Sequence, residues 1–116
     1  MNLNCIIIDS NSLQRFTTIK LTKNHPSLNV IGEFSTALEA KKFLQKTAVD
    51  LILMDIDLPA SNGFELLNIF STNPDLKTPC AIIVSEDTSH AFKAFEYNVI
   101  DYLEKPASEN RFNEAI

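Results

Sequence analysis

The stretch Leu51-Ile52-Leu53-Met54-Asp55 decides the fold of this 116-residue chain. A short apolar run that ends at a carboxylate is typical of a strand buried on both faces of a sheet. Further runs of this kind each end at or near a polar residue: Leu3 to Ile8 before Asp9, Cys80 to Val84 before Ser85, and Val99 to Leu103 shortly before Lys105. The chain therefore contains several predicted buried strands with polar ends.

Segments with the spacing of amphipathic helices separate these runs. In the first segment, Ser12 to Asn24, an apolar face is predicted to pack on the sheet. Leu13, Phe16 and Ile19 form that face. The following His25-Pro26 pair ends the helix, because the residue before a proline avoids helical geometry.

The remaining segments complete the pattern. Leu28 to Phe34 alternates more between apolar and polar residues, which predicts an edge strand. Thr36-Ala37-Leu38-Glu39 has the form of a capping box. Two of the later helices are predicted from Ala40, Phe43 and Leu44, and from Phe112 with Ile116. Another carries Phe64, Leu67 and Phe70 and follows a loop with Pro59, Ser61, Asn62 and Gly63. A further helix carries Ala91, Phe92 and Phe95 and follows a cap at Asp87 or Thr88. Five βα units predict an α/β fold with a parallel sheet covered by helices on both faces.

Composition restricts the class of protein. The length fits one domain, residues 1–116, and 45% apolar residues suffice for a core. No apolar run is long enough to span a bilayer and no basic signal-peptide region is present, so we expect a soluble cytoplasmic protein without membrane contact. A net charge of −5 without a basic cluster argues against direct nucleic-acid binding. Cys5 and Cys80 are predicted to be buried free thiols, and His25 and His90 to be surface residues.

Polar side chains gather where the predicted strands end. Asp9, Asp55, Ser85 and Lys105 each follow a different strand. Any one of them alone is more simply read as an ordinary polar strand end. Because ligands bind at the carboxyl edge of open α/β sheets, the four together predict a site. Two carboxylates, a hydroxyl and a lysine would supply two cation ligands, a phosphate hydrogen-bond donor and a phosphate counter-charge.

Two motifs in this order carry a family resemblance that covers essentially the whole chain. Asp50-Leu-Ile-Leu-Met-Asp55-Ile-Asp-Leu-Pro59 with Asn62-Gly63, and Asp101-Tyr-Leu-Glu-Lys105-Pro106, resemble the receiver domain of a two-component response regulator. Ala94-Phe95-Glu96-Tyr97 is similar to receivers attached to LytTR-type DNA-binding domains. The resemblance implies a flavodoxin-like (βα)5 sandwich with strand order 2-1-3-4-5. It also implies that the chain is either one part of a longer protein with an output domain or a single-domain receiver.

The resemblance implies a role for each site residue. Asp55 would accept a phosphoryl group from a sensor histidine kinase, which makes the chain an acceptor and not a turnover enzyme. Asp9, Asp55 and the main-chain carbonyl of Asp57 would hold Mg²⁺, a cation that prefers hard oxygen ligands. Ser85 and Lys105 would contact the phosphoryl oxygens.

The family also implies a switch and an output surface. Tyr102 would turn inward when Ser85 moves, and the Lys105-Pro106 bond would be cis. Phosphorylation would then alter homodimerisation, or contact with a DNA-binding output domain, at one face of the fold. That face comprises residues 88–97, 99–103 and 107–116.

The sequence departs from the family at the site. Ser10 stands where receivers carry a second acid, and Asn11 offers only an amide oxygen, so weaker Mg²⁺ binding and slower phosphorylation are expected. Glu86 replaces a small residue and could crowd or repel the phosphate. Asp57 and Asp87 occupy positions that modulate dephosphorylation in the family, although both are equally well read as solvated loop acids.

Three functions therefore remain open. The first is a phosphorylated receiver with a weakened Mg²⁺ site, and it is favoured. The second is a pseudo-receiver that acts as an interaction module without phosphate, which Ser10 and Glu86 support. The third is a nucleotide or flavin domain, which is disfavoured because Gly32 and Gly63 cannot build a glycine-rich phosphate loop and tryptophan is absent.

Overall fold

Five apolar runs form one parallel sheet in the computed structural model, which describes residues 2–58, 63–72, 79–87, 89, 91–94, 96–97, 99–105 and 107–116. The strands are β1 (Leu3–Ile8), β2 (Leu28–Phe34), β3 (Leu51–Met54), β4 (Cys80–Ser85) and β5 (Val99–Glu104). Their order is β2-β1-β3-β4-β5, with every neighbouring pair parallel. This confirms the predicted flavodoxin-like α/β fold, with β2 at an edge.

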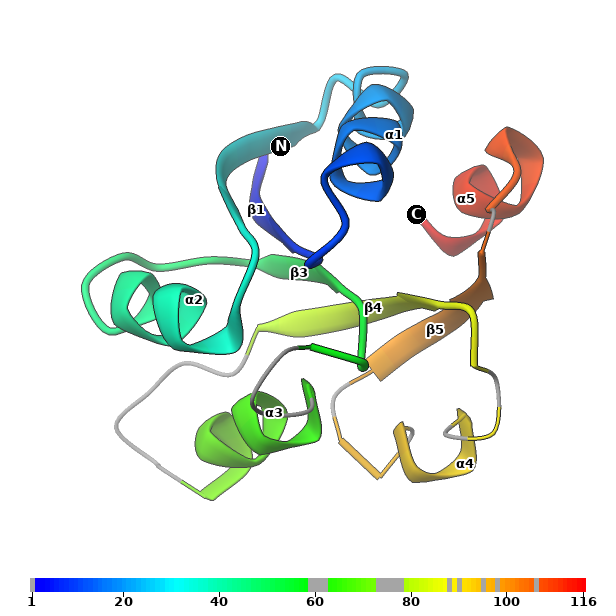
Figure 1. Ribbon diagram of the computed structural model, residues 1–116. Coiled ribbons are helices and arrows are strands. Elements are labelled where there is room, and N and C mark those ends of the chain that lie inside the picture. The colour runs from blue at the N-terminus through cyan, green and yellow to red at the C-terminus, as the bar shows by residue number, and fades with distance from the viewer. Residues whose placement is uncertain are drawn as a thin grey trace.

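Helices cover both faces of this sheet. They are α1 (Ser12–Thr22), α2 (Ala37–Leu44), α3 (Gly63–Thr72), α4 (Ala91–Ala94) and α5 (Glu109–Ala115). Figure 1 shows α1 and α5 on one face and α2, α3 and α4 on the other. Side chains cap three of the helices: Asn11 accepts from the main chain of Leu13 and Gln14, Thr36 from Glu39, and Ser108 from Arg111. Thr36 therefore caps α2 as predicted, and its hydroxyl donates to Glu39 Oε1 at 3.0 Å.

Two apolar clusters fill the space between the sheet and the helices. Alternate strand residues point to opposite faces, so Ile6, Ile52 and Ile83 pack toward α2 and α3, whereas Ile7, Leu53 and Ile82 pack toward α1 and α5. Phe64 belongs to the first cluster and Phe112 to the second. The sheet is thus buried on both faces in its centre.

The predicted buried face of α1 is wrong in part. Leu13 and Phe16 are 68% and 58% exposed, and only Ile19 of that predicted set packs against the core. Thr18 and Thr22 are buried instead. The Thr22 hydroxyl donates to the carbonyl oxygen of Ile19 at 2.6 Å, so this polar side chain is satisfied inside the helix and can face the core.

Other predictions have mixed outcomes. Both cysteines are free, but only Cys5 is buried, whereas Cys80 is partly exposed. His25 is half-buried against Phe112 and is not a simple surface residue. No helix in the described ranges is long and apolar enough to cross a membrane. Some predictions concern positions outside the described residues or side chains: Pro59, Ser61, Asn62, Thr88, His90, Phe95 and Pro106 with its peptide bond, and the side chains of Phe70 and Phe92.

The register of the sheet places the strand ends at one level. Ile8 at the end of β1 pairs with Met54 at the end of β3, so Asp9 and Asp55 leave the sheet side by side. Ser85 pairs with Glu104, and the main-chain N–H of Lys105 continues this ladder by donating to the Ser85 carbonyl at 2.9 Å. Residues from four strands therefore meet at one edge.

Candidate functional site

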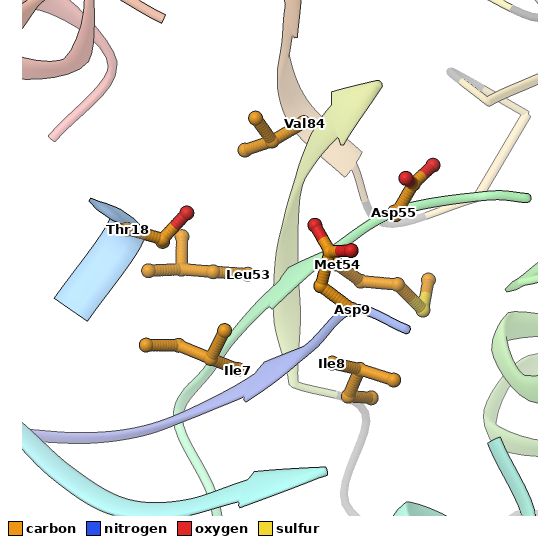
Figure 2. Close-up of a pocket in the computed structure, with 8 residues that line it drawn as sticks. All are labelled: Ile7, Ile8, Asp9, Thr18, Leu53, Met54, Asp55 and Val84. Carbon is orange, nitrogen blue, oxygen red and sulfur yellow. The ribbon is translucent and has the colours of Figure 1, made fainter. Parts of the chain in front are cut away.

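Two buried carboxylates lie at this edge of the sheet. Asp9 is 3% exposed and Asp55 is 8% exposed. Main-chain hydrogen bonds fix both: Asp9 donates to the carbonyl of Phe34 at 3.0 Å, and Asp55 donates to that of Ile8 at 2.9 Å. Figure 2 shows the two side chains just beyond the ends of neighbouring strands, in a pocket whose other lining residues are mostly apolar.

Lys105 lies between the two carboxylates. Its Nζ is 2.8 Å from Asp9 Oδ2 and 2.6 Å from Asp55 Oδ2, and its side chain is 5% exposed. Burial by itself disfavours the charged ammonium. Hydrogen bonds to Asp55 and Asp9 and the negative charges of both outweigh that effect, so the pKa of Lys105 lies above its ordinary value of 10.5. One positive charge is thus shared by two acids.

The second oxygen of each carboxylate faces the main chain. Asp9 Oδ1 accepts the N–H of Asn11 at 2.9 Å, and Asp55 Oδ1 accepts the N–H of Asp57 at 3.0 Å. Each acid therefore has one oxygen fixed by its own loop and the other directed at Lys105. This arrangement pre-orients both groups before any ligand binds.

The donor chemistry fits a magnesium ion held by few carboxylates. Asp9 and Asp55 already contact a common positive centre, and Mg²⁺ commonly takes one or two carboxylates, a carbonyl and waters. Within the described residues, however, no three His, Cys, Asp or Glu side chains are grouped to hold a metal. Ser10 is exposed and brings no charge. The carbonyl of Asp57 stays the predicted third ligand.

Ser85 and Tyr102 belong to a second set of contacts beside the acids. The Ser85 side chain is fully buried and its Oγ accepts the N–H of Asp87 at 3.2 Å. The hydroxyl of Tyr102 donates to the carbonyl oxygen of Asp87. The loop after β4 is therefore connected to both predicted switch residues.

The electrostatics of Tyr102 link it to the acidic site. Burial raises the pKa of its phenol, and a hydrogen bond with Ser85 lowers it. The negative charges of Asp87, Asp57 and Asp55 raise it further, so the pKa lies above its ordinary value. The charge of Asp55 is therefore the smallest of the named contributions to the pKa of Tyr102.

Some features of the site had not been predicted. Asn11, considered as a poor cation ligand, uses its amide oxygen to cap α1. Arg15 donates from Nη1 to the carbonyl oxygen of Asp9 at 2.7 Å. Its place in the first turns of a helix directly after Asp9 was the available signal. Glu86 and Asp57 have exposed side chains.

The fold and the polar strand ends together define the class of receiver domains. Residues 5–116 match the family model described as "Response regulator receiver domain", so the chain belongs to that family. It is a receiver domain of two-component signalling, similar to receivers of LytTR-type regulators.

Individual relatives agree with this family. The chain is 32% identical over 106 residues to the transcriptional regulatory protein YpdB of Escherichia coli K12, covering 91% of this chain and 43% of that protein. It is 32% identical over 110 residues to the sensory transduction protein LytT of Bacillus anthracis, covering 94% and 44%. The chain thus spans less than half the length of these relatives. Among solved structures, the response regulatory domain of MrkE from Klebsiella pneumoniae matches with a TM-score of 0.88 and 29% identity, covering 97% of this chain and 91% of that one.

Proposed function

We propose that Asp55 accepts a phosphoryl group from the phosphohistidine of a sensor histidine kinase in the cytoplasm. An oxygen of the Asp55 carboxylate attacks phosphorus, the P–N bond to the imidazole breaks, and an acyl phosphate forms. The observation that supports this most directly is the Lys105 ammonium 2.6 Å from Asp55 Oδ2, in a largely water-excluded position. The chain acts as an acceptor domain and not as a turnover enzyme.

Charge is the main obstacle to this reaction, because a carboxylate must approach a negatively charged phosphoryl group. Asp9, Asp55 and the carbonyl of Asp57 would hold Mg²⁺, whose charge offsets the repulsion when it is bound. Lys105 contributes a second, permanent positive charge, which can follow the phosphoryl oxygens as Asp55 is modified. Ser85 can rotate its hydroxyl to donate to the same group.

Phosphorylation adds roughly −1.5 to −2 charges to this edge of the sheet. A shift of Ser85 toward those charges would disturb the hydrogen bond that its Oγ accepts from the N–H of Asp87. The carbonyl oxygen of Asp87 in turn accepts a hydrogen bond from the hydroxyl of Tyr102. We propose that this chain of contacts alters the face formed by α4, β5 and α5. That face would bind a second copy or a DNA-binding output domain, without direct contact between this domain and nucleic acid.

A pseudo-receiver is the second candidate function. Lys105 already supplies one positive charge between the two buried acids, and the described residues contain only two of the carboxylates expected here. Such a domain would switch through partner binding alone. Ser10 is the substitution that favours this alternative.

Beryllofluoride with Mg²⁺ tests the two candidates, because it forms a phosphoryl-like adduct on an acceptor carboxylate. We expect shifts in the amide spectra of Asp55, Asp57 and Asp87 that require Mg²⁺ and vanish in Asp55→Asn. Asp101→Asn is the matched control, since Asp101 is a β5 carboxylate that pairs with Arg111. A spectrum unaffected at high Mg²⁺ would reject phosphorylation. Sedimentation with the same adduct tests the switch, and an unchanged mass would reject dimer control.

A further inference from the structure

Arg15 joins three parts of the fold beside the acidic site. Its Nη1 donates to the carbonyl oxygen of Asp9 at 2.7 Å, and its Nε lies 3.4 Å from Glu33 Oε1 on β2. Its side chain is 18% exposed, although arginine is a long and strongly polar residue. The shorter of these two contacts therefore joins the guanidinium to a main-chain carbonyl of the Asp9 loop.

That carbonyl controls the direction of the loop. A peptide unit is planar, so fixing the carbonyl of Asp9 also fixes the N–H of Ser10 and the rotation of the chain between the two residues. Two other hydrogen bonds of the loop restrain different groups: the N–H of Asp9 donates to the carbonyl of Phe34, and the N–H of Asn11 donates to Asp9 Oδ1. Arg15 supplies the one described side-chain bond to this peptide plane.

We propose that Arg15 is a positioning residue for the cation site, which holds the Asp9 carboxylate toward Asp55. The inference rests on the proposed function and extends it to a residue that touches neither metal nor phosphate. The need is greater here than with two adjacent acids, because Ser10 cannot substitute for a displaced Asp9. By holding Asp9 in place, Arg15 would preserve the Mg²⁺ affinity that a loop with a single acid can provide.

The charge of Arg15 acts in the opposite direction to its geometry. A permanent positive charge near the site disfavours a second cation, so removing the charge alone would tighten Mg²⁺ binding. Removing the geometric restraint would weaken it. Arg15→Lys keeps the charge but lacks the planar fork, and Arg15→Gln removes the charge, so the pair separates the two effects.

The experiment compares both variants with Arg111→Gln, which removes an arginine–carboxylate contact distant from the acids. Mg²⁺ is titrated against the amide signals of Asp55 and Asp57. We expect a dissociation constant about three- to tenfold higher in Arg15→Lys, because it loses one hydrogen bond to the loop. Arg15→Gln should show a smaller increase, because the loss of the positive charge partly offsets the loss of the restraint. Arg111→Gln should show no change. Thermal unfolding confirms that the variants remain folded at the temperature used.

A readout without metal accompanies the titration. The amide of Asn11 should exchange with solvent several-fold faster in both Arg15 variants, because its acceptor is the Asp9 carboxylate. Three results would overturn the proposal. The Mg²⁺ affinity could be unchanged in both variants, or it could rise in Arg15→Gln and stay unchanged in Arg15→Lys. The third is an unchanged exchange rate of the Asn11 amide. If the parent protein fails to bind Mg²⁺, the proposed function fails, whereas Asn11 exchange still decides whether Arg15 positions the loop.

Discussion

Lys105→Met is the perturbation that tests the buried charge cluster most directly. Methionine retains the apolar length of the side chain but removes the ammonium that both carboxylates share. Asp9 and Asp55 then face each other at 3% and 8% exposure without a counter-charge. The variant should therefore be less stable than the parent protein at neutral pH.

The size of the effect follows from the contacts that remain. Removing one partner of a buried ion pair costs about 3–5 kcal/mol. Each acid here keeps one main-chain hydrogen bond, from Asn11 or Asp57, so we expect the lower end, about 3 kcal/mol. This is a large part of the roughly 5–15 kcal/mol that stabilises an ordinary domain.

Urea unfolding at pH 7, with and without Mg²⁺, measures this loss. Mg²⁺ should stabilise the variant more than the parent, because it binds the folded acids without competition from Lys105. Arg111→Gln serves as the control and should show no such difference from the parent.

The result that would refute the reasoning is a loss below about 1 kcal/mol at pH 7, the usual range of an exposed pair. A loss that added Mg²⁺ does not reduce would also contradict it. Either outcome would mean that solvent already screens the two acids, and that Lys105 is not their essential counter-charge.

Further predictions concern other residues. Ser10→Asp should tighten Mg²⁺ binding about tenfold by restoring a carboxylate, as measured by calorimetry, and an unchanged affinity would contradict the assigned site. Cys5 is buried, and that burial raises the pKa of its thiol to about 11. Iodoacetamide at pH 8 should therefore modify the partly exposed Cys80 first, as followed by mass spectrometry. Equal rates of modification at the two cysteines would contradict this. The Arg111 guanidinium lowers the pKa of Asp101 below its ordinary 3.8, so this pair stabilises the fold above that pH and the contribution is lost as the pH falls further. Arg111→Gln should therefore cost about 0.5 kcal/mol at pH 7 and less at pH 3, and a constant loss by urea unfolding would argue against the pairing.

The sheet and the central charges were predictable because strong local patterns specify them. A run such as Leu51 to Met54 has few alternatives to a buried strand, and parallel pairing brings the residues after each run to one edge. Asp9, Asp55 and Lys105 meet there, as the sequence predicted. Roles in catalysis and cation binding stay predictions.

Other features depend on contacts that no residue pattern contains. The apolar spacing of Leu13 and Phe16 predicted their burial, but α1 is turned so that Thr18 and Thr22 face the sheet. Threonine can occupy such a face because its hydroxyl finds an acceptor in the preceding turn. Arg15 was overlooked for a related reason: its partner is a main-chain carbonyl, a group present at every residue.

The charge cluster also has a consequence for how the protein is made. Its members come from β1, β3 and β5, and Lys105 follows Asp55 by 50 residues. Synthesis proceeds from the N-terminus, so both acids leave the ribosome before their counter-charge does. Until β5 joins β4, the two acids lack the Lys105 ammonium that lies between them in the folded domain. The buried charge cluster is therefore complete only when β5 is in place.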